Sequence, residues 1–169
     1  MTKKKQTNRI YYLGAILLAA ILVFLDQFTK HLAVIHLKGR ESFVLIQGVF
    51  EFSYLENRGA AFGIFENMQW LFILATLVIL AVALIIFIKL PKTSHFLPLL
   101  ITMAVVAAGA IGNLADRILH GYVIDFLYFS LIDFPIFNVA DVYIVMGCLL
   151  FVIFYVGYSD SDFAYLKKN

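Results

Sequence analysis

Asp125 and Asp141 are the residues of this chain whose type and placement most clearly suggest chemistry. They stand sixteen residues apart, at the edges of apolar segments, in a sequence that is 63% hydrophobic. Carboxylates are costly near hydrocarbon, so such acids are functional candidates. Two carboxyl groups held close together cannot both ionise cheaply, and one of them keeps its proton. The ionised member can then deprotonate a water while the protonated member polarises a carbonyl, which is acid–base catalysis without a metal or cofactor.

The other polar residues gather in short clusters near the same ends of the apolar segments. Asp26 and Lys30 are four residues apart, and Asn113 and Asp116 are three apart, so each pair shares a helix face. We expect one polar site that joins the two aspartates to Asp26, Lys30, Asn57, Gly59, Asn113, Asp116, Arg117 and Asn138. A simpler reading of Asp26 and Lys30 is an ion pair on the surface of one helix. For Asn113, Asp116 and Arg117 the simpler reading is a structural network.

The elements that must position these residues are long apolar runs. Only 14% of the residues are charged, whereas soluble domains average about a quarter. Runs long enough to cross a bilayer cover approximately residues 11–34, 68–90, 96–119 and 138–158. The first run follows a basic amino terminus as in a signal peptide, but no small-residue cleavage pattern follows it, so we interpret it as a retained span. A net charge of +2 without a basic patch argues against nucleic acid as a partner. The dispersed histidines and the lone cysteine predict no metal site.

Lysines and arginines set the expected orientation of the spans. Eight of the thirteen flank one side, which predicts that both termini are cytoplasmic and that the connections 35–67 and 120–137 are on the outer face. Region 35–67 contains two strand-like stretches separated by Gly48, and a further strand-like stretch starts at Tyr122. Residues 160–169 are expected to form a disordered tail. The predicted fold is a single membrane domain over residues 1–169, an all-α integral membrane protein with four transmembrane helices and a small extracytoplasmic β-sheet cradle.

Five short motifs in order resemble those of the lipoprotein signal peptidases (signal peptidase II). They are Asp26-Gln-Phe-Thr-Lys30, Asn57-Arg-Gly-Ala-Ala-Phe62, Gly112-Asn-Leu-Ala-Asp-Arg117, Gly121-Tyr-Val-Ile-Asp-Phe126 and Phe137-Asn-Val-Ala-Asp141. The resemblance implies an aspartyl endopeptidase of the bacterial cytoplasmic (inner) membrane, with its active site at the outer face. Such an enzyme removes the signal peptide from prolipoproteins that carry diacylglycerol on a cysteine, and it cuts on the amino side of that cysteine.

The resemblance also assigns roles to residues. It makes Asp125 and Asp141 the catalytic pair, and it leaves the other eight residues of the predicted site to bind the substrate or support the pair. It implies no cofactor and no metal. The expected partners are the diacylated prolipoprotein, membrane lipid and an inhibitor of the globomycin type.

Two readings from other functional classes remain open at this level. A small proton-coupled transporter would use the four aspartates as a proton relay, but it would distribute them through the depth of the membrane. A scaffold protein would use the small residues of the third span as a docking face and would leave the aspartate pair unexplained.

Overall fold

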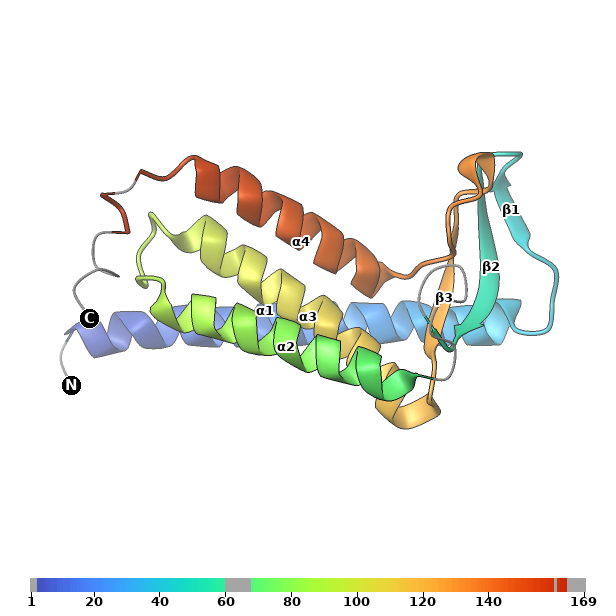
Figure 1. The fold of residues 1–169 in the computed structure, drawn as a ribbon, viewed down its shortest axis with the longest axis horizontal. Helices are drawn as coiled ribbons and strands as arrows, with labels where there is room; N and C mark the ends of the chain where they lie inside the picture. The colour runs from blue at the N-terminus through green and yellow to red at the C-terminus, as the bar shows by residue number, and fades with distance from the viewer. Residues whose placement is uncertain (1–2, 60–67, 160, 164–169) are drawn as a thin grey trace.

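The protein is an elongated bundle of helices with a small sheet at one end (Figure 1). The computed structural model describes residues 3–59, 68–159 and 161–163, with side chains from Asn8 onward. Its helices are α1 (Lys3–Leu37), α2 (Gln69–Lys89), α3 (Leu97–His120) and α4 (Val139–Val156). Each of these four described helices contains a stretch long and apolar enough to cross a membrane. The predicted fold class, four apolar helices with a small sheet, is confirmed.

Helix α3 occupies the centre of the bundle and packs against α1, α2 and α4. Its small residues allow this because they let neighbouring backbones approach closely. A Cβ added at Gly109 would lie 2.4 Å from the carbonyl oxygen of Ala140, and one added at Gly112 would lie 2.5 Å from a carboxylate oxygen of Asp26. These two glycines therefore decide how near α4 and the polar residues of α1 can come to α3.

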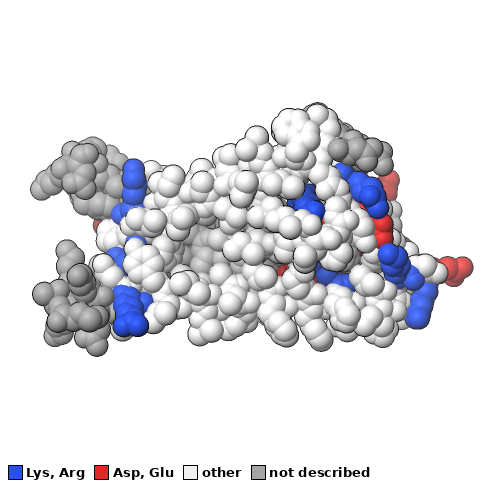
Figure 2. All heavy atoms as spheres, turned by 90° about the horizontal axis from the view of Figure 1, so that it is seen from below, with Lys and Arg blue, Asp and Glu red and all other residues white. Residues whose placement is uncertain are grey.

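The outer surface of the bundle is apolar along most of its length. On the face shown in Figure 2, lysine and arginine gather toward the two ends and a broad uncharged band lies between them. Large apolar side chains are exposed on α2 and α4, among them Leu84 and Val145. Exposed apolar surface of this extent is typical of contact with lipid rather than water.

The sheet joins segments that are far apart in the sequence. Strands β1 (Phe43–Ile46), β2 (Phe50–Asn57) and β3 (Val123–Tyr128) form an antiparallel sheet in the order β1-β2-β3. Gly48 has a φ of +69°, which suits the turn between the first two strands. The third strand comes from the connection after α3, so the sheet extends beyond the predicted region 35–67.

Two shorter segments complete the described chain. A 3₁₀ helix, η2 (Ser130–Ile132), lies between β3 and α4. Within the tail predicted to be disordered, residues 161–163 form a turn, and the ring of Phe163 lies 5.9 Å from that of Phe96. The rest of that tail lies outside the described residues.

Candidate active site

Asp125 and Asp141 line one cavity where the sheet meets the ends of the helices. The cavity has a volume of about 500 Å³, and Asn57, Gly59 and Arg117 also line it. Asp125 comes from β3 and Asp141 from the first turn of α4. The sheet and the last helix therefore each contribute one carboxyl group to the same space.

The start of α4 fixes the carboxylate of Asp141. Asn138 is the N-cap residue, and its side-chain oxygen accepts a hydrogen bond from the backbone N–H of Asp141 at 3.0 Å. In return, Oδ2 of Asp141 accepts from the backbone N–H of Asn138 at 3.0 Å. This reciprocal capping box satisfies two backbone donors that the first turn of a helix leaves free. The i, i+3 spacing of the two residues thus caps the helix and also fixes the position of the Asp141 carboxylate in the site.

Asp125 is held by two side-chain amides and is almost completely buried. Oδ1 of Asp125 accepts from Nδ2 of Asn138 at 2.6 Å, and Oδ2 accepts from Nδ2 of Asn57 at 2.8 Å. Asn57 is placed beside Asp125 by the pairing of β2 with β3, in which it lies opposite Val123. Its own side-chain oxygen accepts from the backbone N–H of Gly59 at 3.1 Å. Both oxygens of Asp125 therefore have defined donors.

Asn113 of α3 connects the second carboxylate to a buried cation. Its Nδ2 donates to Oδ1 of Asp141 at 2.7 Å, while its Oδ1 accepts from Nζ of Lys30 at 2.9 Å and from Nδ2 of Asn138 at 3.1 Å. An ammonium group can only donate, so Lys30 fixes which end of the Asn113 amide faces it. The amide N–H is consequently turned toward Asp141.

Lys30 lies between two carboxylates in the interior of the protein. Its Nζ is 2.9 Å from Oδ2 of Asp26 and 3.0 Å from Oδ2 of Asp116, and no member of this trio is more than 1% exposed. Oδ1 of Asp26 also accepts from the backbone N–H of Ala140 at 2.9 Å, and Oδ2 of Asp116 accepts from that of Ile124 at 3.1 Å. The reading of Asp26 and Lys30 as a surface ion pair is therefore wrong. The trio joins α1 to α3, to the start of α4 and to β3.

Gln27 belongs to this network and was not predicted for the site. Its Nε2 donates to Oδ1 of Asp116 at 2.9 Å and lies 3.2 Å from both Oδ2 of Asp26 and the carbonyl oxygen of Gly112. Its position three residues before Lys30 puts it on the same helix face, and this spacing could have identified it.

Arg117 forms no ion pair with its sequence neighbour Asp116 among the residues described here. Adjacent residues of a helix do not face each other, so closeness in sequence is a poor guide to which charged groups form an ion pair. The guanidinium of Arg117 instead lies over the ring of Phe72 at 5.2 Å and donates a hydrogen bond to the carbonyl oxygen of Asn113 at 3.4 Å. Arg117 thereby adds a positive charge to the wall of the cavity.

The environment of Asp125 favours its protonated form. Burial, followed by the negative charge of Asp141, raises the pKa of Asp125 to about 7. The hydrogen bonds from Asn57 and Asn138 act in the opposite direction but do not offset this rise in the pKa of Asp125. Near neutral pH, Asp125 can therefore carry a proton where an ordinary aspartate could not.

The structure brings the predicted site residues together at one end of the bundle. Five of them line the cavity: Asn57, Gly59, Arg117, Asp125 and Asp141. The other five lie behind these in the hydrogen-bond network: Asp26, Lys30, Asn113, Asp116 and Asn138. Residues 60–62 of the second motif lie outside the described residues. Within the described part of the chain, no group of three or more His, Cys, Asp or Glu side chains is arranged to hold a metal ion.

Comparison with known proteins gives consistent matches over most of the chain. Residues 18–156 match the family described as signal peptidase (SPase) II. The lipoprotein signal peptidase of Caldanaerobacter subterraneus is 46% identical over 137 residues, which cover 80% of this chain and 91% of that protein. The lipoprotein signal peptidase of Clostridium tetani is 41% identical over 151 residues, covering 86% and 96% of the two chains.

Two solved structures described as bacterial membrane enzymes have the same fold. One superimposes with a TM-score of 0.73 at 32% identity, covering 85% of this chain and 88% of the other. The second gives a TM-score of 0.72 at 34% identity, covering 83% and 90%.

Proposed function

The chain belongs to the signal peptidase II family, and from that premise we propose that Asp125 and Asp141 make it an aspartic endopeptidase. It is a multi-pass bacterial membrane protease that removes signal peptides from lipoproteins, as the motifs of its sequence had suggested. The proposed substrate is a prolipoprotein diacylated on a cysteine, and the proposed cut is on the amino side of that cysteine. The proton-coupled transporter has no support from these relatives.

One observation carries the aspartic mechanism: the buried carboxyl group of Asp125 and the partly buried one of Asp141 line one cavity, and each is held by two N–H donors. The donors keep both groups in place before a substrate arrives, so little reorganisation is needed during the reaction. Burial and the negative charge of Asp141 raise the pKa of Asp125 to about 7, so this member can keep a proton near neutral pH. We assign Asp125 as the protonated acid and Asp141 as the ionised base.

In the first step a water held between the two carboxyl groups attacks the carbonyl carbon of the scissile peptide bond. Asp141 takes a proton from this water, and Asp125 gives its proton to the carbonyl oxygen. The product is a neutral gem-diol, with Asp141 now protonated and Asp125 ionised.

In the second step the gem-diol collapses and the carbon–nitrogen bond breaks. Asp141 returns its proton to the leaving amine, and Asp125 recovers a proton from a hydroxyl of the gem-diol. The pair is restored, the signal peptide leaves with a new carboxyl terminus, and the lipoprotein leaves with a new amino terminus on its cysteine.

The shape of the cavity suits a substrate that stays in the bilayer. One side is polar and holds the aspartates, whereas the other continues along α4 past Val142, Val145 and Met146. We place the apolar part of the signal peptide or the acyl chains of the substrate along this side. Burial of acyl chains contributes roughly 0.8 kcal/mol per methylene to membrane retention. The positive-inside pattern supports an outer-face location for the cavity and cytoplasmic termini.

The test is cleavage of purified prolipoprotein in detergent or nanodiscs, read as a mobility shift. The wild-type protein should cleave the diacylated substrate, should leave the non-diacylated one intact, and should be blocked by globomycin. Asp125→Asn and Asp141→Asn should each lose at least about a thousandfold in rate, since removal of a catalytic group that acts directly on the reacting atoms has effects of this order.

The matched control is Asp133→Asn. Asp133 lies between β3 and α4, its carboxylate is engaged by Tyr128, and its φ of 48° is one that asparagine adopts readily. This variant should keep wild-type turnover. Wild-type turnover by a folded Asp125→Asn or Asp141→Asn protein would refute the proposed mechanism.

A further inference from the structure

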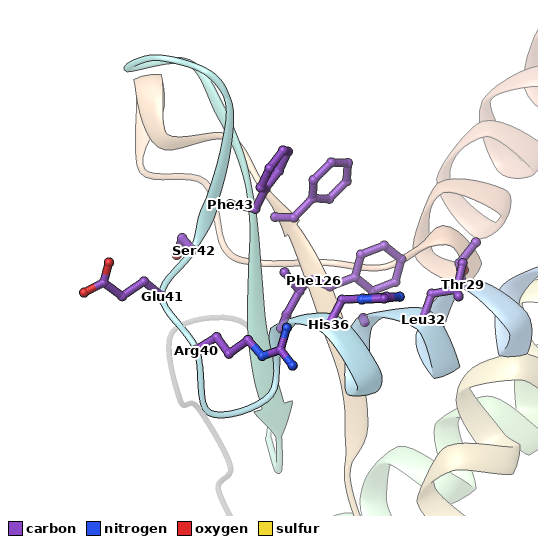
Figure 3. A pocket seen from close by; sticks show the side chains of 11 residues that line it. Thr29, Leu32, His36, Arg40, Glu41, Ser42, Phe43 and Phe126 are labelled. Carbon is purple, nitrogen blue, oxygen red and sulfur yellow. The ribbon is translucent and has the colours of Figure 1, made fainter.

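A second cavity lies on the other side of the sheet from the candidate active site. It has a volume of about 690 Å³ and is formed by the last turns of α1, the turn that follows α1, and the sheet (Figure 3). Its apolar wall includes Leu32, Ala33, Phe43, Phe52 and Phe126. We call this cavity the α1 groove. A cavity of this size and composition is in the range of ligand-binding sites.

The α1 groove and the active-site cavity share a strand but not a face. Phe126 lines the groove, whereas its neighbour Asp125 lines the active-site cavity. Successive side chains of a strand point to opposite faces, which explains this division. A molecule in the groove would therefore touch the back of the strand that carries Asp125 without entering the proposed path of the substrate.

The position of the groove on α1 places it at the edge of the bilayer. The apolar part of α1, Asn8–Leu37, contains 30 residues, which as a helix measures about 45 Å, whereas the hydrocarbon core is roughly 30 Å thick. The ends of α1 must therefore reach into the headgroup regions. The groove runs from Thr29 and Leu32 to Arg40, that is, from the apolar part of the helix toward its end.

The polar end of the groove offers Arg40, a cation that has no ion-pair partner among the described residues. Arg40 forms no ion pair with any residue that the structure describes, unlike Lys38, whose Nζ lies 2.8 Å from Glu56. In Figure 3 the guanidinium of Arg40 points toward the end of α1 that carries His36, and the carboxylate of Glu41 points away from the groove. A guanidinium binds a phosphodiester well because its N–H groups match two phosphate oxygens.

We propose that the α1 groove binds an anionic glycerophospholipid, with one acyl chain against Phe43, Phe52 and Phe126 and its phosphate on Arg40. The apolar wall and its depth in the membrane match the acyl chains of such a molecule, and Arg40, which has no ion pair within the described part of the chain, matches its phosphate. A zwitterionic lipid fits less well, because its own cation offsets the phosphate charge that Arg40 would neutralise. The bound lipid would brace β3 from the face opposite Asp125.

The first experiment counts retained lipids by native mass spectrometry after exchange into phosphatidylglycerol, phosphatidylcholine or neutral diacylglycerol. The wild-type protein should retain one phosphatidylglycerol in preference to the other two. Arg40→Gln should lower this retention about tenfold, the effect expected for loss of a charge-assisted contact, and Arg40→Lys should restore part of it. Arg9→Gln changes the same residue type near the opposite end of α1 and should have no effect.

The second experiment locates the lipid. Trp70 is the only tryptophan of the chain and is exposed at the start of α2, so it reports general lipid contact. A Phe43→Trp, Trp70→Phe protein carries its reporter in the groove instead. Brominated phosphatidylglycerol should quench this reporter several-fold more than brominated phosphatidylcholine does, whereas native Trp70 should be quenched equally by both.

Equal retention of all three lipids, or equal losses in Arg40→Gln and Arg9→Gln, would overturn the proposal. Equal quenching of the groove reporter by both brominated lipids would overturn it as well. A prolipoprotein that cross-links through its signal peptide to position 43 would assign the groove to substrate instead. The retention and quenching experiments measure lipid binding alone, so their outcome does not depend on the aspartic mechanism.

Discussion

At the scale of single residues, a buried cation orients one of the amides that hold the catalytic candidates. The ammonium group of Lys30 can only donate hydrogen bonds. The side-chain oxygen of Asn113 therefore faces Lys30, and its N–H faces Asp141. Asp125 is held by Asn57 and Asn138, and burial together with the negative charge of Asp141 raises its pKa to about 7. The proton is therefore expected on Asp125 and the negative charge on Asp141.

This assignment predicts a pH profile for the reaction. Asp125 must be protonated to act, and its pKa is about 7, so kcat/KM should fall as the pH rises above about 7. The measurement is initial rate at low substrate from pH 5 to pH 9. A rate that stays constant up to pH 9 would contradict the role of Asp125 as the acid.

The same raised pKa predicts how stability depends on pH. The folded state holds this proton more tightly than the unfolded chain, where aspartate has a pKa near 3.8. The contribution of Asp125 to stability is therefore complete below about pH 4 and is lost as the pH rises to about 7. The Asp125→Asn variant has no titrating group at this position. The melting temperature of this variant minus that of the wild type should therefore increase from pH 5 to pH 8. No change in that difference would show that the pKa is not raised.

Lys30 should contribute to stability more than any exposed lysine. Lys30→Met leaves Asp26 and Asp116 buried without their cation, and removal of one partner of a buried ion pair typically costs about 3–5 kcal/mol. Lys38→Met is the control, because its pair with Glu56 is exposed and such pairs contribute about 0–1 kcal/mol. Unfolding in detergent measures both variants. Similar small losses in the two would mean that Lys30 carries no structural charge.

Much of the site could be predicted from sequence because helix periodicity places Asn113 with Asp116 and Asn138 with Asp141. Helix periodicity could not predict which side chain on another helix forms an ion pair or hydrogen bond with each of these residues. Asp116 is paired with Lys30, 86 positions away, rather than with Arg117 beside it. That choice depends on how α1 packs against α3, which no local spacing encodes.

At the scale of elements, small residues on α3 determine the approach of α4. Gly109 lies against the backbone at Ala140, one residue before Asp141. Since α4 cannot move away without displacing Asp141, packing here also sets the width of the active site.

We therefore expect Gly109→Ala to destabilise the bundle by about 1–3 kcal/mol, as overpacking of a tight interface does. It should also lower kcat, because the added methyl group pushes the start of α4 outward. Gly14→Ala is the control, since a Cβ there meets nothing within 4 Å. Unfolding and turnover of both variants test this, and equal behaviour of the two would exclude a tight α3–α4 contact.

The spans were accessible from sequence because hydropathy over about 20 residues reports burial in lipid directly. The full extent of the sheet was harder to predict from the sequence. The stretch that begins at Tyr122 reads as strand-like, but its pairing with β2, with Asp125 opposite Leu55, depends on contacts across 70 positions. The position of Asp125 beside Asn57 follows from that pairing alone.

At the scale of the whole molecule, lysine and arginine gather toward the two ends of an apolar bundle on the face shown in Figure 2. This arrangement fixes the molecule across the membrane, and the lysine and arginine bias indicates its direction. In a Cys148→Ser background, Glu41→Cys should react with a membrane-impermeant maleimide in intact cells, whereas Ser94→Cys should react only after lysis. The opposite pattern would place the sheet and the aspartates on the cytoplasmic side.

The contacts of Asn138 link the folding of α4 to the assembly of the candidate active site. Asn138 begins α4, holds Asp141 and donates to Asp125, so the formation of the last helix and the assembly of the catalytic pair are one event. A nascent chain that has inserted only its first three helices lacks Asp141, so under the proposed mechanism it could not cleave. Under the proposed mechanism, formation of the last helix therefore supplies the residue that completes the active site.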